Sequence, residues 1–381
     1  MRRTNLLLCI LGSLWFNACT DDSNVLPEPA EKCEADAFAS ARAIANQAMI
    51  DFGFGVKSRS VSDTNVEILF TDSALSDTAA YIVNYKDGGF AIVNPNAETQ
   101  VYAISVDGSY QPGVIPASDA YMAAIIGGNR PVKPTPLPLD SMVIQQPDPD
   151  FLHPPYTNVY ENLTPTWYQS DPFNRYCPLI SYLPQQRALT GCTPLAIAEV
   201  CSVKNYPERI GDRFFDWNEI RTAENIEDLS ATSLDNLAFI ISKIGSYAGT
   251  TYEPLTSSTT FSGALKACKS LGFQNAREIN TSDDLRNELK KKSPVCMFGT
   301  HAPGKEDEAS HTWVGDGLMI HGRYIDNSGL ITDFPIPSGY EETYYVHCNW
   351  GWGGTNNGYF VLGTSYSVNS YKFEKLRILA F

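Results

Sequence analysis

One stretch near the C-terminus decides the fold, Tyr344-Tyr345-Val346-His347-Cys348-Asn349-Trp350-Gly351-Trp352-Gly353-Gly354. Its first five residues predict a strand, and the glycines that follow permit a tight turn with positive φ. In such a turn the two Trp rings can cover a buried polar interaction. The Asn349 side chain can accept the Nδ1–H of a neighbouring imidazole and fix its orientation. The alternatives are a purely structural aromatic turn and a platform on which a sugar stacks.

A candidate imidazole lies upstream, in Ala309-Ser310-His311-Thr312-Trp313-Val314-Gly315-Asp316-Gly317. This segment enters a predicted strand from a loop, so His311, Trp313 and Gly315 share one face. His311 is therefore the candidate general base. The other histidines are His153, His301, His321 and His347. Of these, His347 suits a core position with satisfied hydrogen bonds.

The candidate nucleophile is Cys192, in Gln186-Arg187-Ala188-Leu189-Thr190-Gly191-Cys192-Thr193-Pro194-Leu195-Ala196-Ile197-Ala198-Glu199-Val200. The apolar residues predict a buried helix, and Gly191 and Pro194 suit its first turn. Unpaired N–H groups and the helix dipole favour a thiolate there, which is the nucleophilic form. A small buried cysteine at a helix start is the alternative. Gln186 is the candidate oxyanion donor, together with the Cys192 N–H, and Gln185 competes for that role.

Residues 157–381 divide into a helical front half and a β-rich back half. The predicted helices cover residues 192–204, 233–247, 260–271 and 282–291. The predicted strands cover residues 294–299, 311–319, 343–349 and 358–362. A helical lobe followed by a β lobe gives an α+β fold class.

Residues 34–127 are predicted to form a small α+β domain that carries no catalytic constellation. We expect a helix over residues 36–50, a hairpin of strands 81–85 and 90–93, a strand over 101–106 and helical spacing over 117–126. Residues 128–156 contain eight prolines, which prevent regular structure and predict an extended, protease-accessible linker.

The N-terminus is typical of an export signal over residues 1–18. Arg2 and Arg3 precede an apolar core, Leu6–Phe16, which is too short to span a bilayer. The stretch ending in Ala18-Cys19 resembles a bacterial lipobox, which predicts lipid attachment at Cys19 and a polar tether over residues 19–33. We therefore expect an exported protein, anchored by lipid at the outer membrane or cell surface. An ordinary signal peptide cleaved near Ala18 is the alternative.

The composition excludes one class of partner and leaves the cysteine pairing open. The formal net charge is −15, and a chain without basic clusters is a poor nucleic-acid binder. Six of the nine cysteines have no role in signal, lipid attachment or catalysis: Cys33, Cys177, Cys201, Cys268, Cys296 and Cys348. They allow fifteen disulfide pairings, although we favour buried free thiols. No spacing matches a zinc site, so neither metal nor cofactor is expected.

Together the motifs resemble the streptopain family of papain-like cysteine peptidases. The matching segments are Thr190-Gly191-Cys192 with Asn205-Tyr206-Pro207, Ser310 to Gly317, Asn349 to Gly354, and Gly88 to Val93 in the first domain. The resemblance implies a two-lobed papain-like fold, an inhibitory pro-domain over residues 34–127, an activation linker over 128–156 and an endopeptidase domain over 157–381. It also implies protein or peptide substrates, a Cys192-His311-Asn349 site shaped by Trp350 and Trp352, and release of the mature enzyme.

The sequence departs from that family directly before the base. The family has Gly-Gly there, whereas this chain has Ala309-Ser310, so Ser310 is expected to shape the site or narrow the cleft. Two other functions remain open. The chain can be a catalytically silent surface lipoprotein of peptidase ancestry, or a glycan-binding lipoprotein that uses Trp350 and Trp352. The glycan hypothesis requires exposed rings, and the peptidase hypothesis requires rings packed over His311.

Overall fold

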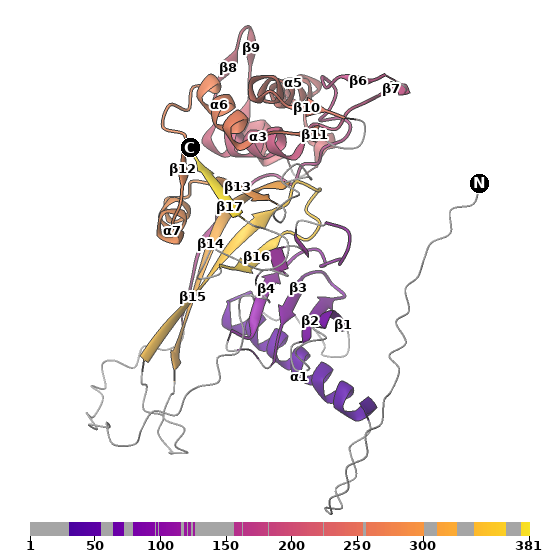
Figure 1. The fold of residues 1–381 in the computed structure, drawn as a ribbon, viewed down its shortest axis with the longest axis vertical. Coiled ribbons are helices and arrows are strands. Elements are labelled where there is room, and N and C mark those ends of the chain that lie inside the picture. The colour runs from indigo at the N-terminus through magenta and orange to yellow at the C-terminus, as the bar shows by residue number, and fades with distance from the viewer. Residues whose placement is uncertain are drawn as a thin grey trace, which may run out of the picture.

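The computed structural model shows a helical lobe above a large antiparallel sheet, whose other end carries the N-terminal domain (Figure 1). The structure describes residues 30–54, 64–71, 79–95, 97, 99–115, 118–119, 121–122, 125, 156–161, 163–181, 183–223, 225–253, 257–300, 311–325, 339–362 and 375–381. The signal, Cys19 and most of the Pro-rich linker lie outside these residues.

The predicted helices and strands that the structure describes occur in the predicted order, together with one helix and several strands that were not predicted. The helices are α1 (Ala30–Asp51), α3 (Cys192–Lys204), α4 (Trp217–Thr222), α5 (Ala231–Ala248), α6 (Phe261–Leu271) and α7 (Ser282–Lys290). The strands of the large sheet are β1 (Thr64–Thr71), β2 (Ala79–Tyr85), β3 (Phe90–Val93), β4 (Val101–Ser105), β5 (Tyr156–Glu161), β12 (Arg277–Ile279), β13 (Val295–Thr300), β14 (His311–Ile325), β15 (Gly339–Asn349), β16 (Gly358–Val361) and β17 (Lys375–Ala380). Three short hairpins decorate the helical lobe: β6–β7 (Leu179–Ile180, Leu183–Arg187), β8–β9 (Arg209–Ile210, Arg213–Phe214) and β10–β11 (Thr251–Tyr252, Ser257–Ser258).

The sheet runs without a break from the N-terminal domain into the β lobe. Its strand order is β1-β2-β3-β4-β16-β15-β14-β13-β17-β12, and β5 pairs with β14. The junction is the antiparallel pairing of β4 with β16, where Ile104 lies opposite Tyr359 and Ala103 opposite Phe360. The two parts are thus joined by backbone hydrogen bonds, which the sequence did not indicate.

Two hydrophobic cores lie on opposite faces of the sheet. One core combines residues of the N-terminal domain, such as Ile92 and Ile104, with Trp313 and Phe360 of the β lobe. The other joins the buried faces of α3, α5 and α6 to the opposite side of β13 and β14. The strands supply both cores because successive side chains point to opposite faces. Met297 accordingly enters the first core, and its neighbour Phe298 enters the second.

Helix α3 is the central helix of the molecule and is buried on all sides. Residues 193–202 are buried, since the helix is enclosed between the helical lobe and the sheet. Gly191 before it has φ +85°, and a Cβ there would meet Ser257 at 3.2 Å. The helix ends at Asn205, which takes the left-handed conformation with φ 51°. Both ends agree with the predicted range of residues 192–204.

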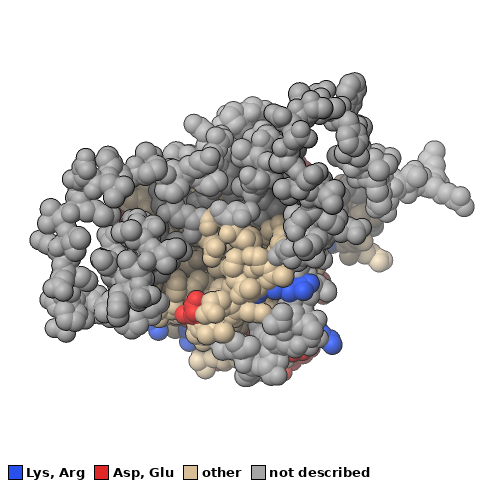
Figure 2. Space-filling view, turned by 90° about the horizontal axis from the view of Figure 1, so that it is seen from below, with Lys and Arg blue, Asp and Glu red and all other residues tan. Residues whose placement is uncertain are grey.

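The surface agrees with the charge analysis where it can be seen. In the view from below, the described residues are mostly uncharged, with separate rather than clustered Lys and Arg groups (Figure 2). Within the described ranges, no helix combines the length and apolarity needed to cross a bilayer.

Candidate active site

Cys192 is the first residue of α3 and lies partly buried between that helix and β14. Its Sγ accepts a hydrogen bond from the backbone N–H of Thr312 at 3.4 Å. The neighbouring hydroxyls of Thr193 and Thr312 are 2.7 Å apart and tie α3 to β14. The thiol therefore meets the start of the strand that carries the candidate base.

His311 is the first residue of β14 and is hydrogen-bonded to Cys192. Its Nε2 lies 3.0 Å from the carbonyl oxygen of Trp350. A carbonyl can only accept, so Nε2 must carry a proton. Nδ1 is then the nitrogen left to face the thiol. The ring also stacks over Trp313 with a centroid separation of 6.4 Å, as expected for residues on one strand face.

The two groups favour an ion pair. Burial opposes ionisation of Cys192, but the charge and hydrogen bond of His311 and the Thr312 N–H lower the thiol pKa to about 7. Burial likewise opposes the charged imidazole, but the Cys192 hydrogen bond and charge and the Trp350 carbonyl raise the pKa of His311. A thiolate beside an imidazolium is the pairing that nucleophilic catalysis by cysteine requires.

Asn349 does not contact the imidazole, which corrects the expectation from sequence. Its Nδ2 donates to Thr164 Oγ1 (2.8 Å) and to the Pro165 carbonyl (3.0 Å). Its Oδ1 accepts from the Gly351 N–H (3.2 Å) and from Asn357 Nδ2 (3.1 Å). An amide has two donors and two acceptor sites, so these four bonds leave no capacity for His311. The carbonyl of Trp350 occupies the place that Asn349 was expected to fill.

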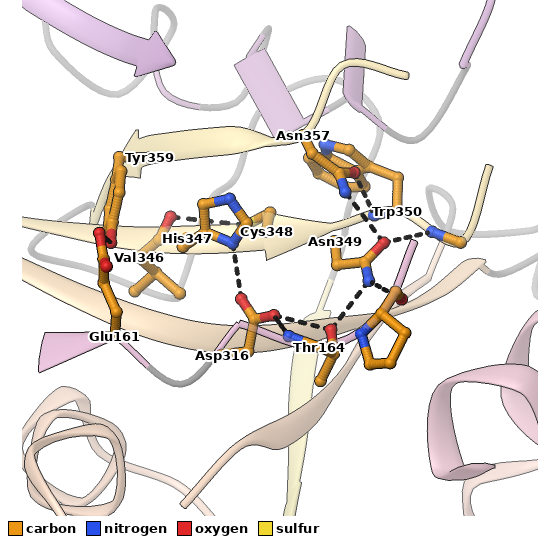
Figure 3. Close-up of polar contacts among 12 residues, drawn as sticks. Glu161, Thr164, Asp316, Val346, His347, Cys348, Asn349, Trp350, Asn357 and Tyr359 are labelled. Atoms are coloured by element: carbon orange, nitrogen blue, oxygen red, sulfur yellow. Dashed lines mark hydrogen bonds and ion pairs between the residues drawn. The ribbon is translucent and has the colours of Figure 1, made fainter. Parts of the chain in front are cut away.

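Asn349 nevertheless holds the peptide group that orients His311. The Trp350 carbonyl and the Gly351 N–H belong to one planar peptide unit. His311 binds the oxygen of this unit, and Asn349 binds its N–H. Asn357 fixes the preceding unit, since its Oδ1 accepts the Trp350 N–H at 3.0 Å. The amide thus acts on the base through one peptide plane. Figure 3 shows the Asn349 side chain between its partners Thr164 and Asn357.

Asp316 anchors this arrangement from below, as Figure 3 shows. Its buried carboxylate accepts hydrogen bonds from the Thr164 N–H (2.6 Å), the Thr164 hydroxyl (2.7 Å) and His347 Nδ1 (2.6 Å). The register between β14 and β15 shifts between Gly315 and Gly317, and this bulge places Asp316. His347 is therefore a histidine with a structural partner, as its strand position predicted.

A match to the Peptidase C10 family spans residues 167–360, half of the chain, and includes Cys192, His311 and Asn349. This chain belongs to the Peptidase C10 family. Streptopain of Streptococcus pyogenes is 23% identical to it over 347 residues, covering 80% of this chain and 79% of streptopain. Thiol protease/hemagglutinin PrtT of Porphyromonas gingivalis is 24% identical over 203 residues, covering 51% of this chain and 23% of that longer protein.

A solved structure supports the papain-like fold of this C10 chain. A mutant prointerpain A fragment of Prevotella intermedia matches with a TM-score of 0.56 at 19% identity, covering 84% of this chain and 98% of the fragment. The predicted streptopain-family resemblance and the α+β papain-like fold are thereby confirmed.

The tryptophans of the C10 turn behave differently from one another. Trp350 is fully buried, packs against Trp313 with centroids 5.0 Å apart, and donates its Nε1–H to the Asn356 carbonyl. Trp352 is 42% exposed. A buried Trp350 cannot stack on a sugar, so the structure disfavours the glycan platform. Ser310, the third residue expected to shape the site, lies outside the described residues.

The structure favours a different glutamine as the candidate oxyanion donor. Gln186 is exposed on strand β7, in a hairpin at the periphery of the helical lobe. Gln169 is buried, and its backbone carbonyl accepts the N–H of Thr190 at 3.0 Å. Thr190 lies two residues before Cys192. Gln169 is thus the better-placed candidate oxyanion donor. Its position after Trp167 and Tyr168, far from the cysteine in sequence, gave no spacing signal.

The other histidines and cysteines have structural positions where they are described. His321 lies 3.0 Å from the Thr157 hydroxyl and contacts Phe52, away from Cys192. His153 and His301 lie outside the described residues. Of the six spare cysteines, the five whose side chains are described are buried free thiols: Cys177, Cys201, Cys268, Cys296 and Cys348. Within the described ranges, no three His, Cys, Asp or Glu side chains are grouped to hold a metal ion.

Proposed function

We propose that this chain is a cysteine endopeptidase zymogen that hydrolyses peptide bonds of proteins through an acyl-enzyme on Cys192. The supporting observation is the Cys192-His311 pair, with Nε2 of the base held by the Trp350 carbonyl. The thiolate attacks the scissile carbonyl, and His311 gives its proton to the leaving amine. His311 then activates the water that releases the acyl group. The Cys192 N–H and Gln169 are our candidates for stabilising the oxyanion.

A peptidyl epoxide should label Cys192 of the processed chain, as mass spectrometry of the labelled peptide would show. Alkylation by iodoacetamide should become half-maximal near pH 7, since the thiolate is the reactive form. In His311→Ala the burial of Cys192 remains while the imidazolium is lost, so the midpoint should rise above the ordinary thiol pKa of about 8.5. No labelling, or equal midpoints in both proteins, would contradict the proposed pair.

We propose that residues 34–127 inhibit the enzyme by docking on the turn that carries Trp350. Asn356 in that turn accepts the Gln111 N–H at 2.8 Å and donates to Ser118 Oγ at 2.9 Å. Tyr121 of the same domain packs against Trp313 and Trp350 with centroids 6.0 and 6.1 Å away. The N-terminal domain therefore touches the element that orients His311. An attached domain also has a high effective concentration at the site until the chain is cut.

Replacing Asn356 with Asp should loosen this docking and speed maturation. Asp keeps the shape and tolerates the left-handed backbone (φ 60°). It loses both donors and places a charge in a buried contact. Since an unsatisfied buried group costs about 1–3 kcal/mol, processing should quicken about tenfold. Gel time courses of the full chain would measure this. Asn236→Asp, a buried change in the helical lobe, should mature at the wild-type rate, and equal rates for Asn356→Asp would refute the docking role.

We further propose that the precursor is exported, lipidated on Cys19 and cut within residues 128–156. The motifs of the sequence support this proposal, together with the N-terminal domain's lack of catalytic residues. A metabolic fatty-acid probe should label the N-terminal fragment of wild type and fail on Cys19→Ser. Sequencing of the active enzyme should find its N-terminus within or directly after the linker. A wild-type chain without label would refute the anchor, and an active enzyme that begins at Cys19 would refute the cut.

A further inference from the structure

Glu199 is a buried acid that the proposed reaction does not use. It lies on α3 seven residues after Cys192, which places both residues on nearly the same helix face. Its side chain is 0% exposed, and neither carboxyl oxygen has a hydrogen bond of ordinary geometry among the described residues, although the Trp167 N–H and the Asn349 amide lie close enough to lower its pKa. A carboxylate without donors in such a place is costly, and a neutral acid is far less so.

The surroundings of Glu199 favour its neutral form. Its carboxyl faces Asp316 of β14, the Asn349 amide and the Trp167 N–H, and the Cys296 thiol of β13 lies nearby. Asp316 takes three hydrogen bonds of 2.6–2.7 Å, so Asp316 is the ionised member of this pair of acids. Two acids that share one buried site cannot both ionise cheaply. Burial first, and then the charge of Asp316, raises the pKa of Glu199 well above its ordinary value, against the lowering effect of Trp167 N–H and Asn349.

Asn349, a neighbour of Glu199, holds the Trp350–Gly351 peptide that orients His311. Asn349 directs its Nδ2 to Thr164 and Pro165 while its Oδ1 holds the Gly351 N–H. A carboxylate at Glu199 would be a stronger acceptor for Nδ2 than these neutral oxygens. Turning the amide toward Glu199 would release the Trp350–Gly351 peptide, whose oxygen orients the imidazole.

We propose that Glu199 is a positioning residue for the Cys192-His311 reaction. As a neutral acid, Glu199 leaves the Asn349 amide in place. When Glu199 ionises, it draws this amide away and thereby disables His311. This inference rests on the proposed peptidase function. The direction in which activity changes with pH follows from the ionisation of Glu199. Below the pKa of Glu199 the amide stays in place, and as pH rises through that pKa the base loses its support. Glu199 would therefore set the alkaline limit of activity.

The test compares Glu199→Gln with wild type, both made as full chains and allowed to process. Gln has the same shape and stays neutral at every pH. With kcat normalised to each protein's own maximum, the alkaline decline of Glu199→Gln should begin about one pH unit or more higher than in wild type. At the alkaline end this is about a tenfold difference. The KM values should remain alike, since Glu199 contacts no described residue that we assign to substrate.

Two further measurements make the result decisive. The His311 Nε2–H resonance in NMR of the full chain should persist to higher pH in Glu199→Gln than in wild type. Glu288→Gln is the matched control, because Glu288 is a buried acid on α7 that pairs with Arg277, and it should leave both profiles unchanged. The proposal would be overturned if kcat of Glu199→Gln and of wild type declined over the same alkaline pH range. It would also be overturned if Glu288→Gln moved that decline by the same amount. If wild type cleaves no peptide, the peptidase function fails and the resonance alone decides the role of Glu199.

Discussion

Replacing Cys192 with alanine should abolish peptide hydrolysis and leave the fold intact. The thiolate is the only atom of the proposed site that bonds covalently to substrate, and loss of a nucleophile costs catalysis on the order of a millionfold. The alanine removes a partly buried sulfur that interacts with Thr312 and His311, so stability should change little. Initial rates on a fluorogenic peptide, with thermal unfolding of the same samples, would measure both effects.

Cys201→Ala is the matched control for that experiment. Cys201 is a buried thiol on the same helix, about two and a half turns from Cys192, and should keep hydrolysis. If maturation is autocatalytic, the Cys192→Ala chain should also accumulate uncut while the control is processed. Turnover by Cys192→Ala at the wild-type rate would end the peptidase proposal.

Replacing Asn349 with alanine should lower both stability and kcat. The substitution strands four buried partners: the Thr164 hydroxyl, the Pro165 carbonyl, the Gly351 N–H and the Asn357 amide. Leaving buried polar groups unsatisfied costs about 1–3 kcal/mol each, although relaxation reduces the sum. We therefore expect a loss of about 3 kcal/mol or more in the free energy of unfolding. Because the Trp350 peptide loses its support, kcat should fall about a hundredfold while KM changes little.

Denaturant unfolding and steady-state kinetics would check both effects. Asn218→Ala, an exposed change on α4, should leave stability and kcat near the wild-type values. An Asn349→Ala protein with wild-type kcat would show that His311 is held by Trp350 without help from the amide.

Local signals explain which parts of the site were predictable. Gly191 and Pro194 mark the start of α3 chemically, so the position of Cys192 at a helix N-terminus followed from the sequence. His311 was likewise identifiable at the start of a strand. The partner of His311 was not, because it is a backbone carbonyl, which every residue has. Asn349 lies next to the turn that supports His311, as its position in the motif indicated. Its predicted bond to the imidazole is absent because its four partners come from Thr164, Pro165, Gly351 and Asn357, which the sequence did not reveal.

Long-range pairing explains what remained unpredictable. Gly315 and Gly317 flank Asp316, but only the register of β14 against β15 shows that a bulge directs this carboxylate to Thr164. Strand β17 enters the sheet between β13 and β12 and completes the second core, although its short sequence was not recognised as a strand. Residues 81–85 and 90–93 form the predicted hairpin, since their turn is local. The pairing of β4 with β16 joins residues about 250 positions apart and carries no local signature.

The junction between β4 and β16 also means that maturation would change the architecture of the enzyme and not only its length. In the precursor, β16 is an interior strand, and Gly358 is so close to the N-terminal domain that a Cβ there would meet Ile104 O, Phe90 Cζ and Ser105 Cβ at 3.0 Å. Once that domain departs, β16 becomes a free strand edge whose N–H and C=O groups turn to water. The space at this glycine is therefore limited by residues of the N-terminal domain and not by the catalytic groups. The mature protein would carry a template for strand addition beside its active-site turn, a surface that the precursor keeps paired.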